Sequence, residues 1–211
     1  MALSFPYPLS FLSDVLRRVD VTFDLQRNDE LSGSGDSRYW TSELARPLWT
    51  VSVSMSAHKP ADARAVDARI RALAGAKGSF LFADPLYAPA AGGVPGSAVT
   101  VRAISTERDM IGLAGLPEGY RVEIGDRFSI ASAAGAIYFG EFAEAAVATS
   151  AGITAQLTVT PYPPLWLGAG ASVELAMPYL KAFIPPGGHT PFTTHPGYYA
   201  DNASLSMVQR P

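Results

Sequence analysis

Polar and apolar residues alternate in two widely separated stretches of the chain. From Trp49 to Met55 every second residue is apolar, and threonine or serine fills each position between. The stretch ASLSMVQ at 203–209 has the same period of two. This period predicts two β-strands that each bury one face. If the later strand pairs with the earlier one, the chain between them contains an insertion.

A helical period replaces the alternation in KPADARAVDARIRALAG. Val66, Ile70 and Leu73 are spaced i, i+4 and i+7, and arginines and aspartates occupy the other face. Pro60 suits a first helical position, and Gly75 suits the residue that follows the C-cap. The stretch predicts one amphipathic helix.

The segment SFLFAD after this helix is too short for a helix and too apolar for an exposed loop. We expect a strand packed beside the one at 49–55, with the helix crossing over between them. Asp84 precedes a proline, which ends the strand, and aspartate is common at the first position of a turn. Asp84 is therefore expected to be a turn residue and not a general acid or base.

Strand-length segments separated by turn residues fill the middle of the chain. They are AVTVRAI, DMIGLAGL, DRFSIAS, GAIYFGEFAEAAVA, ITAQLTVTPYP and ASVELAM, a spacing that suits a small barrel or sandwich. YAPAAGGVPGS before them has the composition of a flexible connector.

The predicted fold is mainly β, in two lobes. An α+β first lobe, sandwich-like with one crossover helix, spans 1–90 and is completed by 182–211. A small β-barrel or sandwich lobe at 97–181 is inserted in it.

Only 17% of the residues are charged, below the roughly 25% of an ordinary soluble domain. Much of the surface is therefore expected to be uncharged or covered by neighbours. The net charge of −3 gives no basic footprint for nucleic acid. The apolar start of the chain has no basic segment before it, and no apolar run is long enough to span a bilayer, so we expect neither a signal peptide nor a membrane partner.

Candidate catalytic and metal chemistry is sparse. The chain has no cysteine, no phosphate-loop lysine and no G-x-S-x-G motif, and the glycine-rich SGSGDS and GAGAS predict turns. His189, His195 and Asp201 have the residue types of a two-histidine, one-carboxylate metal set, but a surface loop is the favoured interpretation. His58 is expected to be exposed. We therefore expect no enzyme activity, no cofactor and no metal.

Aromatic side chains gather in two loops, PYPPLW and PGYYAD. They contribute Tyr162, Trp166, Tyr198 and Tyr199, which are candidates either for interface anchors or for stacking on sugars. A β-rich lobe hosts many functions, so fold alone does not decide between these alternatives.

The order of several segments resembles a family of phage minor tail proteins. IRALAG, GSFLFADPLYAP, EIGDRFSIA, AIYFGEF and LTVTPYPPLWLGAGASVEL follow one another between Trp49 and Lys181. In that family a similar LRG…GTFLLGDP segment precedes a small β-domain with an AGD…IG turn and a proline-containing closing strand. This chain departs from the pattern at Ala83, where the family tends to have glycine, and after TVTP, where a basic residue is missing.

The resemblance implies a structural component of the distal end of a siphophage tail. Distal tail proteins form a ring that joins the tail tube to the baseplate hub. The expected partners are copies of the same chain, six favoured and three possible, with the tail tube protein and the hub protein. Segments before Trp49 and after Lys181 are expected to make many of these contacts. The alternative is a carbohydrate-binding module for host recognition.

Overall fold

The computed structural model describes residues 5–13, 16, 19–56, 58–90, 93, 95 and 98–211. The fold is mainly β, with 49% of residues in strands and 10% in helices, as the sequence predicts. The helical segments described are α1 (Ser10–Ser13), α2 (Pro60–Ala72) and a single 3-10 turn, η1 (Gly75–Lys77).

The first sheet contains the two strands with the period of two. Its order is β1 (Val19–Ser34), β2 (Arg38–Met55), β16 (Ala203–Gln209), β12 (Tyr179–Phe183) and β3 (Phe80–Ala83), and β13 (His189–Thr190) also pairs with β16. The closing strand thus pairs with β2, between Thr50 and Met55. The expected adjacency of β2 and β3 is wrong, because β16 and β12 occupy the positions between them.

One face of β2 and β16 is apolar, and α2 has a matching buried face. Trp49, Val51, Val53 and Met55 alternate with exposed or half-exposed hydroxyl residues, as their period requires. On α2 the buried side chains include Val66 and Ile70, and Leu73 just beyond the helix is also fully buried.

The second sheet forms a nearly closed barrel. Its order is β11 (Ser172–Val173), β4 (Val99–Ile104), β5 (Met110–Ala114), β10 (Ile153–Thr160), β8 (Ile137–Phe142) and β7 (Arg127–Ala131). Ser129 on β7 and Glu174 just after β11 exchange backbone hydrogen bonds of 3.0 and 2.8 Å, which bring the two ends of the sheet together. Two small pairs complete the strands: β6 (Arg121–Val122) with β9 (Ala146–Val147), and β14 (Thr193–His195) with β15 (Tyr199–Asp201).

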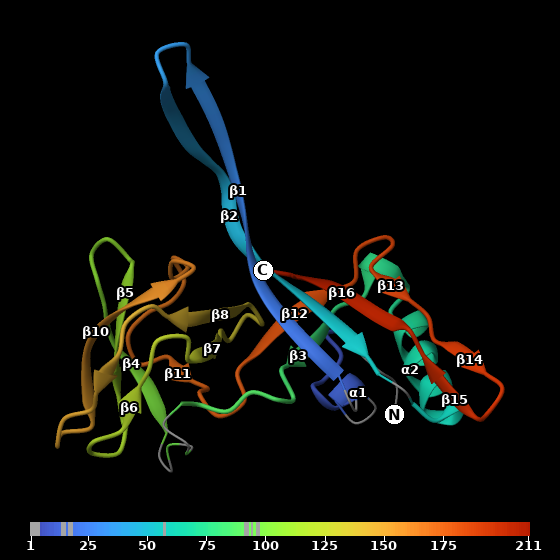
Figure 1. Cartoon of the computed structure of the whole chain (residues 1–211). Coiled ribbons are helices and arrows are strands. Elements are labelled where there is room, and N and C mark those ends of the chain that lie inside the picture. The colour runs from blue at the N-terminus through green and yellow to red at the C-terminus, as the bar shows by residue number, and fades with distance from the viewer. Residues whose placement is uncertain are drawn as a thin grey trace. The chain divides into compact units, whose positions relative to one another are not determined.

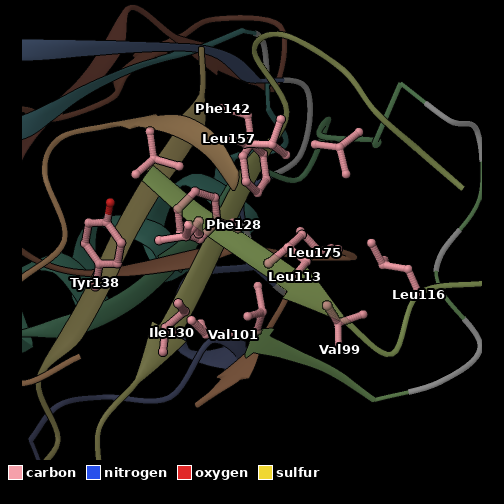
Figure 2. Packing of buried hydrophobic residues seen from close by; sticks show 14 of the residues in the cluster. Val99, Val101, Leu113, Leu116, Phe128, Ile130, Tyr138, Phe142, Leu157 and Leu175 are labelled. Atoms are coloured by element: carbon pink, nitrogen blue, oxygen red, sulfur yellow. The ribbon is translucent and has the colours of Figure 1, made fainter. Parts of the chain in front are cut away.

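All six strands of the barrel contribute to one buried apolar cluster (Figure 2). At its centre the Phe128 ring lies 4.6 Å from that of Phe142 and 5.5 Å from that of Tyr138, centroid to centroid. Gly140 makes room for this packing, since a Cβ there would lie 2.8 Å from the Phe128 ring. The short apolar segments noted in the sequence therefore build a core of their own.

The chain divides into two compact units. One contains 80–181 and the described residues up to Ser13, and the other contains 182–210 and the described part of 14–79. The division after Lys181 falls where the sequence places the end of the inserted lobe. The residues up to Ser13 and β3, expected in the first lobe, are grouped with the barrel instead, and within that unit Tyr7 forms a parallel bridge with Phe80.

Candidate functional site

The hairpin of β1 and β2 contains a long stretch of regularly paired strand that is exposed. Its register runs from Val19 opposite Met55 to Ser34 opposite Arg38. The base of the hairpin lies in the first sheet, whereas every residue of 26–46 whose burial is described is exposed. We call residues 26–46 the arm; Figure 1 shows it extending beyond β16 and α2.

The arm has few neighbours because the sheet ends beneath it. β16 lies beside β2 only from Thr50 onward, and β1 is the last strand of the sheet order. Among the described strands, only β1 and β2 pair with each other along the arm. Pro47, which cannot donate a ladder hydrogen bond, is tolerated in β2 at this position. Register shifts beside Asn28 mark the root of the arm, where a bulge increases strand twist.

Large apolar side chains lie on both faces of the arm. Leu31, Tyr39, Trp40 and Leu44 are each between 61% and 70% exposed. Tyr39 is opposite Gly33 and Trp40 is opposite Ser32, so the two neighbouring aromatic residues point to opposite faces. Two faces that both carry exposed apolar groups are typical of a strand pair that is covered by a partner.

The loop at 161–167 is a second exposed aromatic surface. Tyr162 is 64% exposed, Leu165 84% and Trp166 42%. The Arg108 guanidinium donates hydrogen bonds to the carbonyl oxygens of Pro163, Pro164 and Leu167. The Tyr138 hydroxyl donates to the carbonyl of Pro161 at 2.5 Å. These bonds hold the loop backbone in one shape while the three side chains face outward.

The other aromatic candidates lie on the β14–β15 hairpin. Tyr198 is 90% exposed at the turn, and Tyr199 is 43% exposed. The Tyr199 ring stacks on His195 with 4.8 Å between centroids, so it is partly engaged within the hairpin itself.

His189, His195 and Asp201 do not lie together as a metal set, which the sequence analysis considered but did not favour. His195 Nε2 lies 2.8 Å from Asp201 Oδ1, but His189 Nε2 lies 3.2 Å from Asp67 Oδ1 on α2. The described residues contain no group of three metal-ligating side chains. His189 is separated from the others because β13 pairs with β16, whereas His195 and Asp201 share the β14–β15 hairpin.

His58 is buried, which corrects the expectation of exposure. Only 7% of the residue is accessible, and its backbone exchanges hydrogen bonds with Ala200 on β15. Its ring lies 5.1 Å from that of Phe192. The backbone bridge to β15 buries this residue. Sequence spacing alone cannot reveal such a bridge.

Asp84 is a turn residue, as predicted, and has a second role. Its Oδ1 accepts a hydrogen bond of 2.9 Å from the backbone N–H of Leu86. Its Oδ2 lies 3.0 Å from Nη1 of Arg127 on β7. This ion pair is largely buried, and it ties the end of β3 to the barrel within one unit.

The connector after Asp84 is held to the barrel at least as far as Ala90. The Tyr87 hydroxyl donates to the Arg127 carbonyl at 3.1 Å and accepts from the Arg127 N–H at 2.8 Å. Burial raises the pKa of Tyr87 to about 12. The Ala90 N–H donates to Asp126 Oδ1 at 2.9 Å. The flexible connector expected from composition over 87–97 is therefore wrong for 87–90, because contacts with Asp126 and Arg127 override the local sequence. Residues 91, 92, 94, 96 and 97 of this stretch lie outside the described residues.

Glu141 on β8 lies opposite Arg127 in the β7–β8 ladder. Burial raises the pKa of the Glu141 carboxyl, and the nearby Arg127 charge opposes this shift without cancelling it. Arg127 thus stands between two carboxylates, Asp84 and Glu141, at the place where the connector meets the barrel.

Comparison with known proteins assigns the chain to no family. No family model matches the chain, and no curated protein matches it. In the part of the chain that the structure describes, no helix has both the length and the apolar character needed to cross a membrane.

Proposed function

We propose that this protein is a structural component of a phage tail tip, a distal tail protein that forms a ring between the tail tube and the baseplate hub. The observation that carries the proposal is the arm, with exposed apolar side chains on both faces and no third strand beside it among those described. An exposed strand pair of this kind promotes association, and natural proteins cover such edges or blunt them.

The arm suits a ring better than a two-fold dimer. A closed ring is built from heterologous contacts, in which one surface of a copy meets a different surface of the next. The arm offers two different surfaces, one on the β1 side and one on the β2 side. A low share of charged residues, 17%, is consistent with extensive surface covered by neighbours.

The assignment to a phage tail is supported by the sequence resemblance between Trp49 and Lys181. It names the tail tube protein and the hub protein as partners, six copies as the favoured ring and three as the smaller alternative. Antibodies against the chain should label the distal tip of tailed particles in electron micrographs. Label along the tail or on the head would contradict this placement.

Removal of the arm's apolar groups tests the ring itself. The double variant Tyr39→Ser, Trp40→Ser should be monomeric in mass photometry at concentrations where the unchanged chain is a ring. Leu86→Ser is the matched control, because it removes a large apolar side chain that is 69% exposed outside the arm. Assembly of the double variant equal to that of the control would overturn the role of the arm.

Carbohydrate binding is the second candidate, favoured by the exposed aromatics of the 161–167 loop. Fixed aromatic rings suit stacking on sugar rings, and this loop is held by Arg108 and Tyr138. The full chain on a host glycan array should then bind through Tyr162 and Trp166. Absence of binding, or binding unchanged in the Tyr162→Ala, Trp166→Ala variant, would exclude this function for the loop.

A further inference from the structure

The β14–β15 hairpin, which lies beside α2 in Figure 1, has one face that combines an aromatic ring with hydrogen-bonding groups. The ladder places two directly opposed pairs on this face: Thr193 with Asp201, and His195 with Tyr199. All four residues are exposed or half-exposed. The opposite face is turned inward at Ala200, which is fully buried.

The groups on the exposed face are held in place by contacts within the fold. His195 Nε2 lies 2.8 Å from Asp201 Oδ1, and the His195 ring stacks on that of Tyr199 with an interplanar angle of 16°. Beneath them, the backbones of His58 and Ala200 exchange hydrogen bonds of 2.8 and 2.9 Å. The carboxylate and the ring therefore have a fixed geometry before a ligand arrives, which lowers the entropic cost of binding.

The tip of the hairpin holds a tyrosine in a left-handed conformation. Tyr198 has a φ of 63°, which is unfavourable for a residue with a Cβ. The side chain is 90% exposed, so packing within the fold does not compensate for this strain. A strained residue whose ring packs little against its own chain is a candidate for contact with a ligand.

We propose that Thr193, His195, Tyr198, Tyr199 and Asp201, together called the hairpin site, bind a neutral hexopyranose unit of a glycan. The tyrosine rings provide planes for stacking on the C–H face of a sugar. The Asp201 carboxylate accepts hydrogen bonds from sugar hydroxyls, and the Thr193 hydroxyl donates or accepts them. The site shares no residue with the arm and does not require a ring.

Hydrogen-bonding groups distinguish the hairpin site from the 161–167 loop. The exposed side chains of that loop are Tyr162, Leu165 and Trp166, which provide one phenol and one indole N–H but no charge. Stacking alone does not fix the orientation of a sugar, whereas a few placed polar groups do. The negative charge of Asp201 also disfavours acidic sugars, and a protein partner would favour a broader apolar surface.

Saturation-transfer NMR of the full chain measures binding of four neutral probes, the methyl glycosides of glucose, galactose, mannose and N-acetylglucosamine. At least one should bind, with a Kd on the order of 1 mM, the weak affinity expected for a single sugar unit. The methyl glycoside of glucuronic acid should bind about tenfold more weakly than the best neutral probe. Absence of binding by all four neutral probes, or binding of the acidic probe alone, would overturn the proposal.

Variants locate the binding on the surface. Tyr198→Gly removes the ring and introduces the residue that this backbone conformation favours, so it should weaken binding about tenfold or more. The same change should raise the midpoint of thermal unfolding by about 1–2 °C, which shows that lost binding does not come from lost folding. Tyr162→Ala is the matched control, because it removes an exposed phenol outside the hairpin and should leave binding unchanged.

The opposite pattern would overturn the proposal. Binding lost in Tyr162→Ala but retained in Tyr198→Gly would place the sugar on the 161–167 loop instead. Ring assembly of Tyr198→Gly, measured by mass photometry, should equal that of the unchanged chain. Loss of the ring in this variant, without sugar binding by the unchanged chain, would make the hairpin a contact between copies and not a glycan site.

Discussion

Ala74 occupies a backbone conformation that glycine would be expected to occupy. Its φ is 53°, and it follows directly after Leu73, the C-cap of α2. The sequence suggests Gly75 for this role, but the helix ends one residue earlier and both residues are left-handed. A left-handed conformation costs an alanine about 1 kcal/mol.

Ala74→Gly should therefore stabilise the protein, by roughly 0.5 kcal/mol once the greater chain entropy of glycine is subtracted. The free energy of unfolding in urea measures this change. Ala68→Gly, at an exposed position inside the helix, is the matched control and should destabilise by about 1 kcal/mol. A loss of stability in Ala74→Gly would show that the left-handed end of the helix is not strained.

Glu141 provides a pH-dependent prediction. Its pKa is raised in the folded state by burial, so the ionised carboxylate is disfavoured by folding. The resulting cost is absent below the ordinary pKa of 4.5, grows as the pH rises through the raised pKa, and is fully present above it.

Glu141→Gln removes this cost, and it should raise stability at pH 7 by less than about 1 kcal/mol because the group is only half buried. Unfolding curves of the two proteins should converge as the pH falls below the ordinary value. Lower stability of the variant at pH 7 would mean that the interaction with Arg127 outweighs the cost of burial.

At the scale of elements, the connector at 84–90 behaves as part of the barrel. Tyr87→Phe deletes the hydroxyl that accepts a hydrogen bond from the backbone N–H of Arg127 and donates one to its carbonyl. Loss of a partner for two shielded backbone groups should cost about 1–2 kcal/mol. The Tyr87 pKa of about 12 also predicts that stability supplied by this phenol is lost as the pH rises from 10 to 12.

Thermal unfolding of the full chain and of the Tyr87→Phe variant measures this contribution. Leu86→Ala is the control, because its side chain is 69% exposed and should change stability little. Equal stability of Tyr87→Phe and the unchanged chain would show that the connector does not depend on this contact.

The elements with a clear period could be predicted from sequence, and the others could not. The alternation at 49–55 and 203–209 and the helical spacing of Val66, Ile70 and Leu73 report burial of one face, which is a property of local sequence. Neither face of the arm is buried, so its residues do not alternate with a period of two. The sequence therefore predicts the start of β2 only near Trp49. Its pairing is visible only in three dimensions.

The candidate site shows the same limit. The sequence indicates four candidates for interface anchors or sugar stacking because they lie in turn-rich loops, and all four are exposed: Tyr162, Trp166, Tyr198 and Tyr199. The sequence does not single out Leu31, Tyr39, Trp40 or Leu44, because single apolar residues among polar ones form no pattern. A run of Tyr39 and Trp40 close to SGSGDS, a predicted turn, is the one local signal that could have indicated a hairpin tip.

At the scale of the whole molecule, the proposed function requires association between copies of the chain. A low share of charged residues and an arm with exposed apolar side chains on both faces each favour a neighbour, and a closed ring satisfies both. The isolated chain should therefore assemble without any other protein.

Native mass spectrometry of the purified full chain over a dilution series tests this most directly. If the copies form a closed ring, the spectrum should contain a discrete species with six times the mass of the 22.3 kDa chain, or three times for the smaller ring, and no open-ended series of higher masses. A single species of 22.3 kDa at every concentration, up to the highest that can be measured, would contradict it.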